Sequence, residues 1–237
     1  MRFSSYVMKR LSCIFCVCLL SLVPLSGEVL PDLVQVEITT LAWQKPVSEL
    51  YFLNDGAIQE IKAYTGGFSM PFAYKGPVTL QLYADRSVFS LEPAERPQPV
   101  AVAQLPSGIK EAMLVFIPSG AGQYKVMVWD ASLDGFPAQS YRVYNLSSTR
   151  VAFAIGDTPK VYTIEPRAMQ LVRQAGLIQD RQMVKVQIAQ DAQGGMSLAY
   201  RSLWSVGADT RSTVFILPRS EGRKGVKILK YTQRGID

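Results

Sequence analysis

The sequence predicts an all-β protein, and three observations support this. Short runs rich in Val, Ile, Leu, Tyr and Phe recur along the chain, broken by Gly, Pro, Asp and Asn, as expected of strands joined by turns. In several runs, such as 34–39 and 78–83, apolar and polar residues alternate, which is the period of a half-buried strand. No stretch places apolar residues at i, i+3, i+4 and i+7 over three helical turns, so we expect little helix.

Clear turn signals separate the first expected strands. Asn54-Asp55-Gly56 lies between two apolar runs, and Asp-Gly there predicts a hairpin because both residues tolerate positive φ. Residues 85–99 contain three prolines, which cannot donate to a sheet ladder, so we expect a loop or an edge. The strands expected before residue 131 are 34–39, 50–53, 57–64, 78–83, 100–105, 112–117 and 123–129.

The second part of the chain shows the same strand pattern. The expected strands continue with 140–145, 150–155, 160–164 and 168–173. After a break around Gly176, four more runs follow at 183–189, 196–204, 212–217 and 225–231. Because these last runs are consecutive and joined by short breaks, they predict a four-stranded β-meander.

The run from Tyr141 to Val172 reads as strand, Asn turn, strand, Gly-Asp turn, strand, Pro corner and strand. It resembles the Ig-like domains of bacterial envelope proteins, including uncharacterised ones and those of the pilus-chaperone type. The resemblance covers about thirty residues. It implies a β-sandwich and an envelope location, and it carries over no functional residue.

About fourteen strands with close turns predict two sheets that share a core. We therefore expect an Ig-like β-sandwich domain over 28–175. An additional C-terminal β-meander over 176–237 would pack on that domain or form a small second unit. A closed barrel is the alternative architecture.

The first 27 residues have the three parts of a secretory signal peptide. Arg2, Lys9 and Arg10 precede an apolar run of fifteen residues, 11–25, and Ser26-Gly27 closes it. The run is shorter than the roughly 20 residues that span a bilayer as a helix. We therefore expect cleavage near residue 27, no membrane span in the mature chain, and a periplasmic or extracellular location. An uncleaved N-terminal anchor is the alternative.

Composition argues against an enzyme. The chain has no histidine, which excludes Ser-His-Asp and Cys-His machinery and the usual histidine-ligated metal sites. Its three cysteines, Cys13, Cys16 and Cys18, lie in the signal segment, so the mature chain would have no thiolate or disulfide. We expect no cofactor and no metal site.

One loop stands out as a candidate binding site. Aromatic and methionine side chains cluster around Gly66-Gly67, and loops on rigid β-scaffolds often carry function. An edge strand packing on its own core is the structural alternative. The candidate partner-binding residues are Tyr64, Phe68, Met70, Phe72 and Tyr74.

For several other residues, a structural role is favoured over a binding or catalytic one. Trp43, Trp129 and Trp204 could stack glycans, but core packing is the commoner role of large aromatics. The pair Asp130 and Asp134 has too few oxygens for a calcium loop. Glu92 and Glu95 fit a solvated loop better than a hydrolytic pair. Asn145-Leu146-Ser147 matches the glycosylation acceptor pattern.

Charge also limits the range of partners. The net charge is +6, but the signal segment carries three positive charges and no acid, so +3 remains after cleavage. We expect no nucleic-acid partner. We expect an exported, non-enzymatic protein that binds or assembles with another envelope protein, by β-strand addition at an exposed edge. A carbohydrate-binding module that recognises a glycan is the first alternative, and a hydrolase using carboxylates alone is the second.

Overall fold

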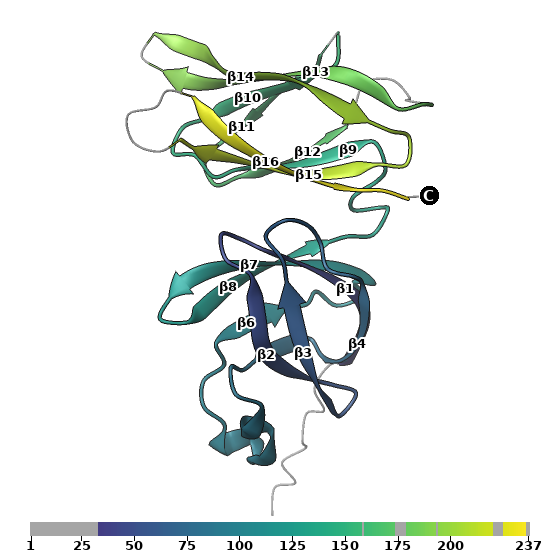
Figure 1. Cartoon of the computed structure of the whole chain (residues 1–237), viewed down its shortest axis with the longest axis vertical. Helices are drawn as coiled ribbons and strands as arrows, with labels where there is room; N and C mark the ends of the chain where they lie inside the picture. The colour runs from purple at the N-terminus through teal and green to yellow at the C-terminus, as the bar shows by residue number, and fades with distance from the viewer. Residues whose placement is uncertain (1–32, 158, 174–178, 193, 220–224, 236–237) are drawn as a thin grey trace, which may run out of the picture. The chain divides into compact units, whose positions relative to one another are not determined.

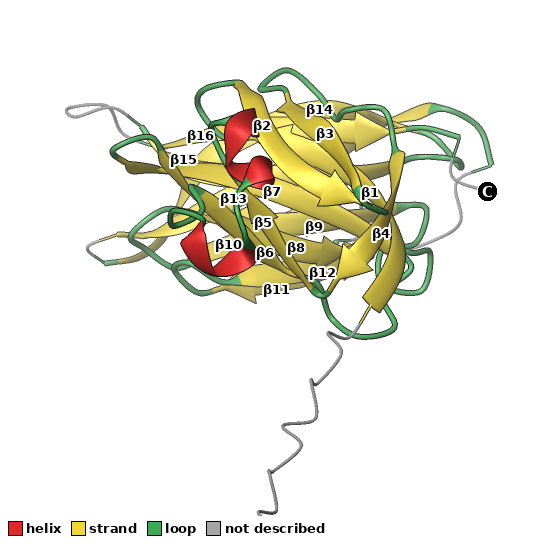
Figure 2. Cartoon of the chain, turned by 90° about the horizontal axis from the view of Figure 1, so that it is seen from below, coloured by secondary structure: helices red, strands yellow, loops and turns green. Residues whose placement is uncertain are grey.

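The computed structural model describes residues 33–157, 159–173, 179–192, 194–219 and 225–235. The expected signal peptide and the three cysteines lie outside these residues. The all-β prediction is confirmed: within the described ranges the helical segments are two short 3₁₀ turns, Arg86–Ser90 and Pro93–Glu95 (Figure 2). Both fall in the proline-rich segment predicted to be irregular. None of the described helices is long and apolar enough to cross a membrane.

Six strands of the first half form one mixed sheet, in which β1 runs parallel to β7 and β6 parallel to β8. The edge strands β4 and β5 are consecutive in the chain, separated by Val78 alone, so the sheet curls nearly closed. This curled sheet is closer to the closed-barrel alternative than to two facing sheets. In spatial order the strands are β4 (Phe72–Pro77), β1 (Leu33–Ala42), β7 (Glu111–Gly120), β8 (Gln123–Asp130), β6 (Ala101–Gln104) and β5 (Thr79–Leu82).

A separate hairpin, β2 (Val47–Asn54) and β3 (Ala57–Ala63), lies beside this sheet (Figure 1). The hairpin predicted at Asp55-Gly56 is confirmed, and both residues have positive φ, 49° and 80°, as a two-residue hairpin turn requires. The hairpin closes the first hydrophobic core. That core is made of buried residues from β1–β7, among them Ile38, Phe52, Ile61, Tyr74, Leu80 and Leu114.

The second half forms two four-stranded sheets that enclose a second core, with Val143 and Val214 on one sheet and Phe153 and Val186 on the other. One sheet has the order β11 (Val161–Ile164), β10 (Val151–Ile155), β13 (Gln182–Ala192) and β14 (Gly195–Val206). The other has the order β12 (Met169–Arg173), β9 (Ser140–Asn145), β15 (Arg211–Pro218) and β16 (Val226–Gln233).

The last four strands do not form the predicted four-stranded meander. The hairpins β13–β14 and β15–β16 exist, but they belong to different sheets. The chain crosses from one sheet to the other at the turn 207–210, between β14 and β15. As a result, Trp204 of β14 and Val214 of β15 reach the second core from the two facing sheets. Strands on the two sides of residue 175, where the sequence predicted the end of the first domain, also pair with each other. β9 pairs with β15 in parallel, and β10 pairs with β13.

A third apolar cluster joins the two halves. Because strand side chains alternate between faces, the even residues of β1 and β7, such as Ile38 and Leu114, face the first core. Leu41 and Met113, on the opposite face, pack instead in a cluster that contains Phe215 of β15. The described residues belong to one compact unit, and this cluster is its internal junction.

Candidate functional site

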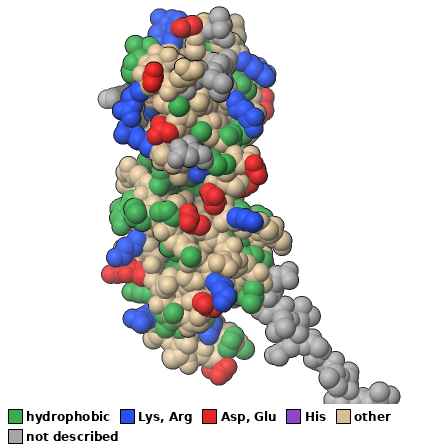
Figure 3. Space-filling model, turned by 90° about the vertical axis from the view of Figure 1, so that its right-hand side faces the viewer, with side chains coloured by type: hydrophobic (Ala, Val, Ile, Leu, Met, Phe, Trp, Pro, Cys, Tyr) green, Lys and Arg blue, Asp and Glu red, His purple; other side chains and the backbone are tan. Residues whose placement is uncertain are grey.

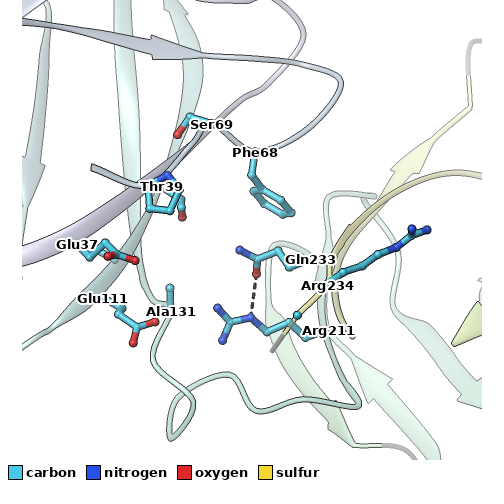
Figure 4. A pocket seen from close by; sticks show the side chains of 12 residues that line it. Glu37, Thr39, Phe68, Ser69, Glu111, Ala131, Arg211, Gln233 and Arg234 are labelled. Atoms are coloured by element: carbon cyan, nitrogen blue, oxygen red, sulfur yellow. Dashed lines mark hydrogen bonds between the residues drawn. The ribbon is translucent and has the colours of Figure 1, made fainter. Parts of the chain in front are cut away.

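A cavity of about 400 Å³ lies at one end of this junction (Figure 4). Strands β1 and β7 supply one wall, and β15 with the end of β16 supplies the other. Phe68, Ser69 and Pro71, from the loop before β4, form its rim. Cavities of roughly 300–1,000 Å³ are the size of small-molecule sites. The volume and the charges of the walls make this cavity the candidate functional site.

Two carboxylates lie side by side on the first wall. Glu37 of β1 and Glu111 of β7 are register partners on parallel neighbouring strands, so their side chains leave the same face of the sheet. Both residues line the cavity. Two like charges at adjacent strand positions repel each other, so the wall favours a cation.

The opposite wall is a hydrogen-bonded array of donors. Arg211 is only 5% exposed; its Nε donates to Oε1 of Gln233 (2.9 Å) and its Nη1 to the carbonyl of Phe136 (2.6 Å). Gln233 is the register partner of Arg211 in the β15–β16 hairpin. Burial lowers the pKa of Arg211, and the negative charges of Glu111 and Asp130 oppose that shift. Arg234 also lines this side of the cavity, but it is exposed and its guanidinium points away from the cavity (Figure 4).

A second buried arginine holds this wall in place. The guanidinium carbons of Arg142 and Arg211 lie 4.3 Å and 4.9 Å from the centre of the Phe136 ring, within the range of cation–π contacts. Arg142 Nη2 donates to the carbonyls of Asp130 and Gly135. Burial foremost, and then the charge of Arg211, lower the pKa of Arg142 to about 10, while Asp130 opposes the shift.

The acidic and basic walls do not form an ion pair with each other. The ion pairs found among the described residues join Lys62 with Glu60, Lys75 with Asp55, and Arg150 with Asp191. Arg211 and Glu111 therefore face each other across the cavity (Figure 4) without direct contact. The hydroxyl of Thr39, another residue that lines the cavity, is buried and has no hydrogen-bond partner within the described part of the chain. The cavity thus presents acceptors on one side and donors on the other.

The predicted aromatic loop lies between this cavity and a second one. Phe68 lines the junction cavity, with its ring 6.1 Å from that of Tyr231. Tyr64, Met70 and Phe72 line a neighbouring cavity of about 270 Å³. Met70 is 84% exposed and Tyr64 50%. The structure therefore places three of the five predicted residues together and one in the adjacent cavity.

The fifth residue, Tyr74, belongs to the first core. It lies in β4, an edge strand of the six-stranded sheet, as the structural alternative for this stretch expected, and its hydroxyl donates to the carbonyl of Pro77 (2.9 Å). Burial raises the pKa of Tyr74 to about 12. Tyr74 and Phe72 are thus strand residues, because the glycine-rich loop ends before them.

The other candidates have structural environments. Trp43 and Trp204 are buried, and Trp129 is half-buried in the junction cluster, so the tryptophans form no exposed row. Asp130 caps the backbone N–H of Ser132 (2.9 Å). No group of three or more potential metal ligands was found among the residues that the structure describes.

The acceptor residue of the glycosylation pattern is also buried. The amide nitrogen of Asn145 donates to the carbonyls of Thr149 (2.8 Å) and Ile164 (3.0 Å), and its Oδ1 accepts from Ser147. The pattern therefore marks a turn that organises β9 and β10. In the folded chain its amide is inaccessible for modification.

The sequence pattern did not identify Glu37, Glu111, Arg211 or Gln233. One feature of the sequence could have identified the two glutamates. Glu37 and Glu111 are an even number of residues from Leu41 and Met113, so they lie on the same strand face as these apolar residues of the junction cluster. A charge at a position with buried neighbours of the same parity indicates a polar site at the edge of an apolar face. No protein-family model matches the chain, and no significant match to a curated protein was found.

Proposed function

We propose that this chain is an exported, non-enzymatic protein that binds an extended segment of another envelope protein beside the loop 64–71. The observation that carries the proposal is the pair of exposed side chains Tyr64 and Met70 at the rim of a cavity of about 270 Å³. Large exposed apolar side chains around a hollow are typical of interaction sites.

Two sheet edges face this cavity. Gln59, Glu60 and Lys62 of β3 line one side, and Met70 and Phe72 line the other. β3 ends the two-stranded hairpin, and β4, which begins at Phe72, ends the six-stranded sheet. Backbone groups of β4 at Ala73 and Lys75 already bond to Asn54 and Asp55, and the carbonyl of Lys62 in β3 accepts from Thr40. The edge that we propose for an added strand is therefore β3 before Lys62.

The register identifies a backbone group that would pair. Tyr51 exchanges backbone hydrogen bonds with Tyr83 (2.8 Å and 2.9 Å), so its N–H and C=O point away from β3. Its register partner on β3 is Glu60. In an antiparallel pair of this kind, both residues direct their backbone groups outward, so Glu60 presents its N–H and C=O to the free edge. An extended partner segment would pair there and place an apolar side chain near Met70.

The proposed location of the protein, and the proposal of an envelope protein as its partner, are based on the N-terminal segment. Its signal-peptide pattern supports export to the periplasm or the cell exterior, where an envelope protein is the available partner. Figure 3 shows one face on which basic and acidic side chains are interspersed, which supports a protein partner over nucleic acid.

The experiment is crosslinked capture from the native envelope with the mature chain. We expect one protein to be captured by wild type and by Glu60→Ala, and to be lost with Glu60→Pro, which removes the outward N–H. Tyr64→Ala combined with Met70→Ala should also lose it. Leu203→Ala, at an exposed apolar residue of β14 (60%), is the matched control and should retain it. Equal capture by all variants would refute the site.

A carboxylate-only hydrolase is the second candidate, because Glu37 and Glu111 share the wall of the junction cavity. They lie on one wall, whereas glycosidase carboxylates flank the bond that is cleaved. Incubation with envelope glycans tests this candidate: release of reducing sugar by wild type, lost in Glu111→Gln, would establish it. The carbohydrate-binding alternative lacks its expected platform, since Trp43 and Trp204 are buried.

The finer fold class also stays a proposal. Two facing four-stranded sheets with a shared core support an Ig-like arrangement. These sheets combine strands on both sides of residue 175, however, so the arrangement would cross the boundary expected from the sequence. An experimental structure of the mature chain tests the assignment.

A further inference from the structure

We propose that the junction cavity is a binding site for a small zwitterion of the amino-acid or short-peptide class. Its ammonium group would lie against Glu37 and Glu111, and its carboxylate against Arg211. This site is separate from the partner-binding edge at Glu60 and does not depend on it.

The opposed walls carry the argument (Figure 4). Glu37 and Glu111 lie on one side of the cavity, and the side chains of Arg211 and Gln233 point into it from the other. An ammonium offers three donors and a carboxylate offers only acceptors. A molecule with both groups matches both walls at once, whereas a simple anion meets the carboxylates and a polyamine meets the guanidinium.

Arg211 is prepared to receive a carboxylate. Its Nε and Nη1 are held by Gln233 and by the carbonyl of Phe136, and its planar group lies on the Phe136 ring. These contacts fix the side chain before any ligand arrives, which reduces the entropy lost on binding. A buried guanidinium also forms stronger hydrogen bonds to a carboxylate than an exposed one.

The carboxylate pair completes the match. Glu37 and Glu111 repel each other across neighbouring strands, and neither pairs with a lysine or arginine among the ion pairs of the described residues. A ligand ammonium placed between them would offset that repulsion. The buried hydroxyl of Thr39, which has no partner within those residues, is a further polar group at this end.

The volume sets the size of the ligand. At roughly 30 Å³ for each water-sized group, a cavity of about 400 Å³ holds about a dozen non-hydrogen atoms. That is the size of a small dipeptide such as alanyl-alanine. Phe68 and Pro71 at the rim offer apolar contact to a short side chain.

Calorimetric titration of the folded mature chain tests the proposal. The probes are L-alanine, L-alanyl-L-alanine, its N-acetyl derivative and its C-terminal amide. We expect the free dipeptide to bind most tightly and each blocked form to bind at least about tenfold more weakly, because each loses one charge-assisted contact. Absence of binding by both zwitterions, or equal binding of the blocked forms, would overturn the site.

Charge variants locate the binding. Glu37→Gln, at an exposed residue, should weaken dipeptide binding about tenfold and should not weaken binding of the N-acetyl form. Arg234→Ala removes a guanidinium that points away from the cavity (Figure 4), so it is the control and should bind the dipeptide as wild type does. Arg211→Lys keeps the charge but loses the planar fork, so it should also weaken binding. Unchanged affinity in both Glu37→Gln and Arg211→Lys would place any binding elsewhere. Partner capture through Glu60 should be unaffected by Glu37→Gln, which separates failure of this site from failure of the proposed function.

Discussion

The ring of Trp43, at the end of β1, meets the ring of Phe215, on β15, edge to face at a centroid distance of 4.9 Å and an angle of 60°. Phe215 is fully buried, and the rings of Trp129, Tyr144 and Tyr231 also lie within 6.4 Å of it. Edge-to-face aromatic pairs add stability beyond the area that they bury. The two halves of the chain are therefore joined by an aromatic cluster centred on one phenylalanine.

Phe215→Ala should destabilise the chain by about 3–5 kcal/mol, the usual cost of removing a buried phenylalanine. It should also loosen the junction, so that the loop 131–139 becomes more sensitive to protease. Phe153→Ala, in the core of the second half, is the control: it should lower stability similarly while the loop stays protected below the unfolding transition. Urea unfolding and limited proteolysis measure both effects. Identical cleavage of the two variants would contradict a joining role for Phe215.

Tyr74 should make the chain sensitive to alkali. Burial raises its pKa from 10.0 to about 12, so the folded chain keeps a proton that the unfolded chain releases. The stability contribution is complete below pH 10 and is lost as pH rises from about 10 to 12, and two pKa units correspond to about 2.7 kcal/mol.

Thermal unfolding between pH 8 and pH 12 checks this expectation. Tyr74→Phe should lose about 1 kcal/mol at neutral pH, because the hydrogen bond to Pro77 is gone. Its stability should then fall less steeply above pH 10 than that of wild type. Some loss should remain, since burial also raises the pKa of Tyr141 and Tyr231. Parallel curves for the two proteins would count against the role of Tyr74.

Asn145→Asp should destabilise the second half by about 2–5 kcal/mol, because two buried carbonyls lose their donor. In wild type those carbonyls, of Thr149 and Ile164, accept from the amide of Asn145. Ser147→Ala removes only one hydroxyl from the same turn and should cost about 1 kcal/mol. Urea midpoints at pH 7 give the comparison. An Asp variant as stable as wild type would show that the turn does not depend on this amide.

Gly135→Ala should disturb the loop that supports Arg142 and Arg211. A Cβ at Gly135 would lie 2.6 Å from Cγ of Asp130, whose carboxylate caps Ser132. Moving Asp130 breaks that cap, and we expect a loss of about 1–2 kcal/mol. Gly66→Ala, where nothing lies within 4 Å of the added carbon, should change stability little. Equal midpoints in thermal unfolding for the two variants would contradict this account.

Local patterns predicted the strands well, because alternation and turn chemistry act over a few residues. Residues 34–39 lie within β1, and the turn at Asp55-Gly56 forms the predicted hairpin. An edge strand near β4 was predicted only as the alternative to a binding loop, because β4 follows a glycine-rich loop and contains Gly76 and Pro77, which disfavour strands. Its partner β1, already predicted as a strand, supplies the pairing that overrides this weak propensity.

The candidate site was less predictable. The sequence singled out Tyr64, Phe68 and Met70 correctly as members of one loop, but it could not show that Phe68 turns toward one cavity and Met70 toward another. That separation depends on Tyr231, which packs on Phe68 from β16. A contact between such distant positions leaves no local pattern.

The sequence by itself determined the all-β class, the main strands and the absence of histidine chemistry, because period, turn residues and composition are local properties. Only the tertiary structure decided which strands pair. The parallel pairings β1–β7 and β9–β15 join distant segments that each have many suitable partners, and the choice depends on the faces that must be buried together. That choice brings Glu111 and Arg211 to opposite walls of one cavity, an arrangement that the strand parity of either residue alone does not reveal.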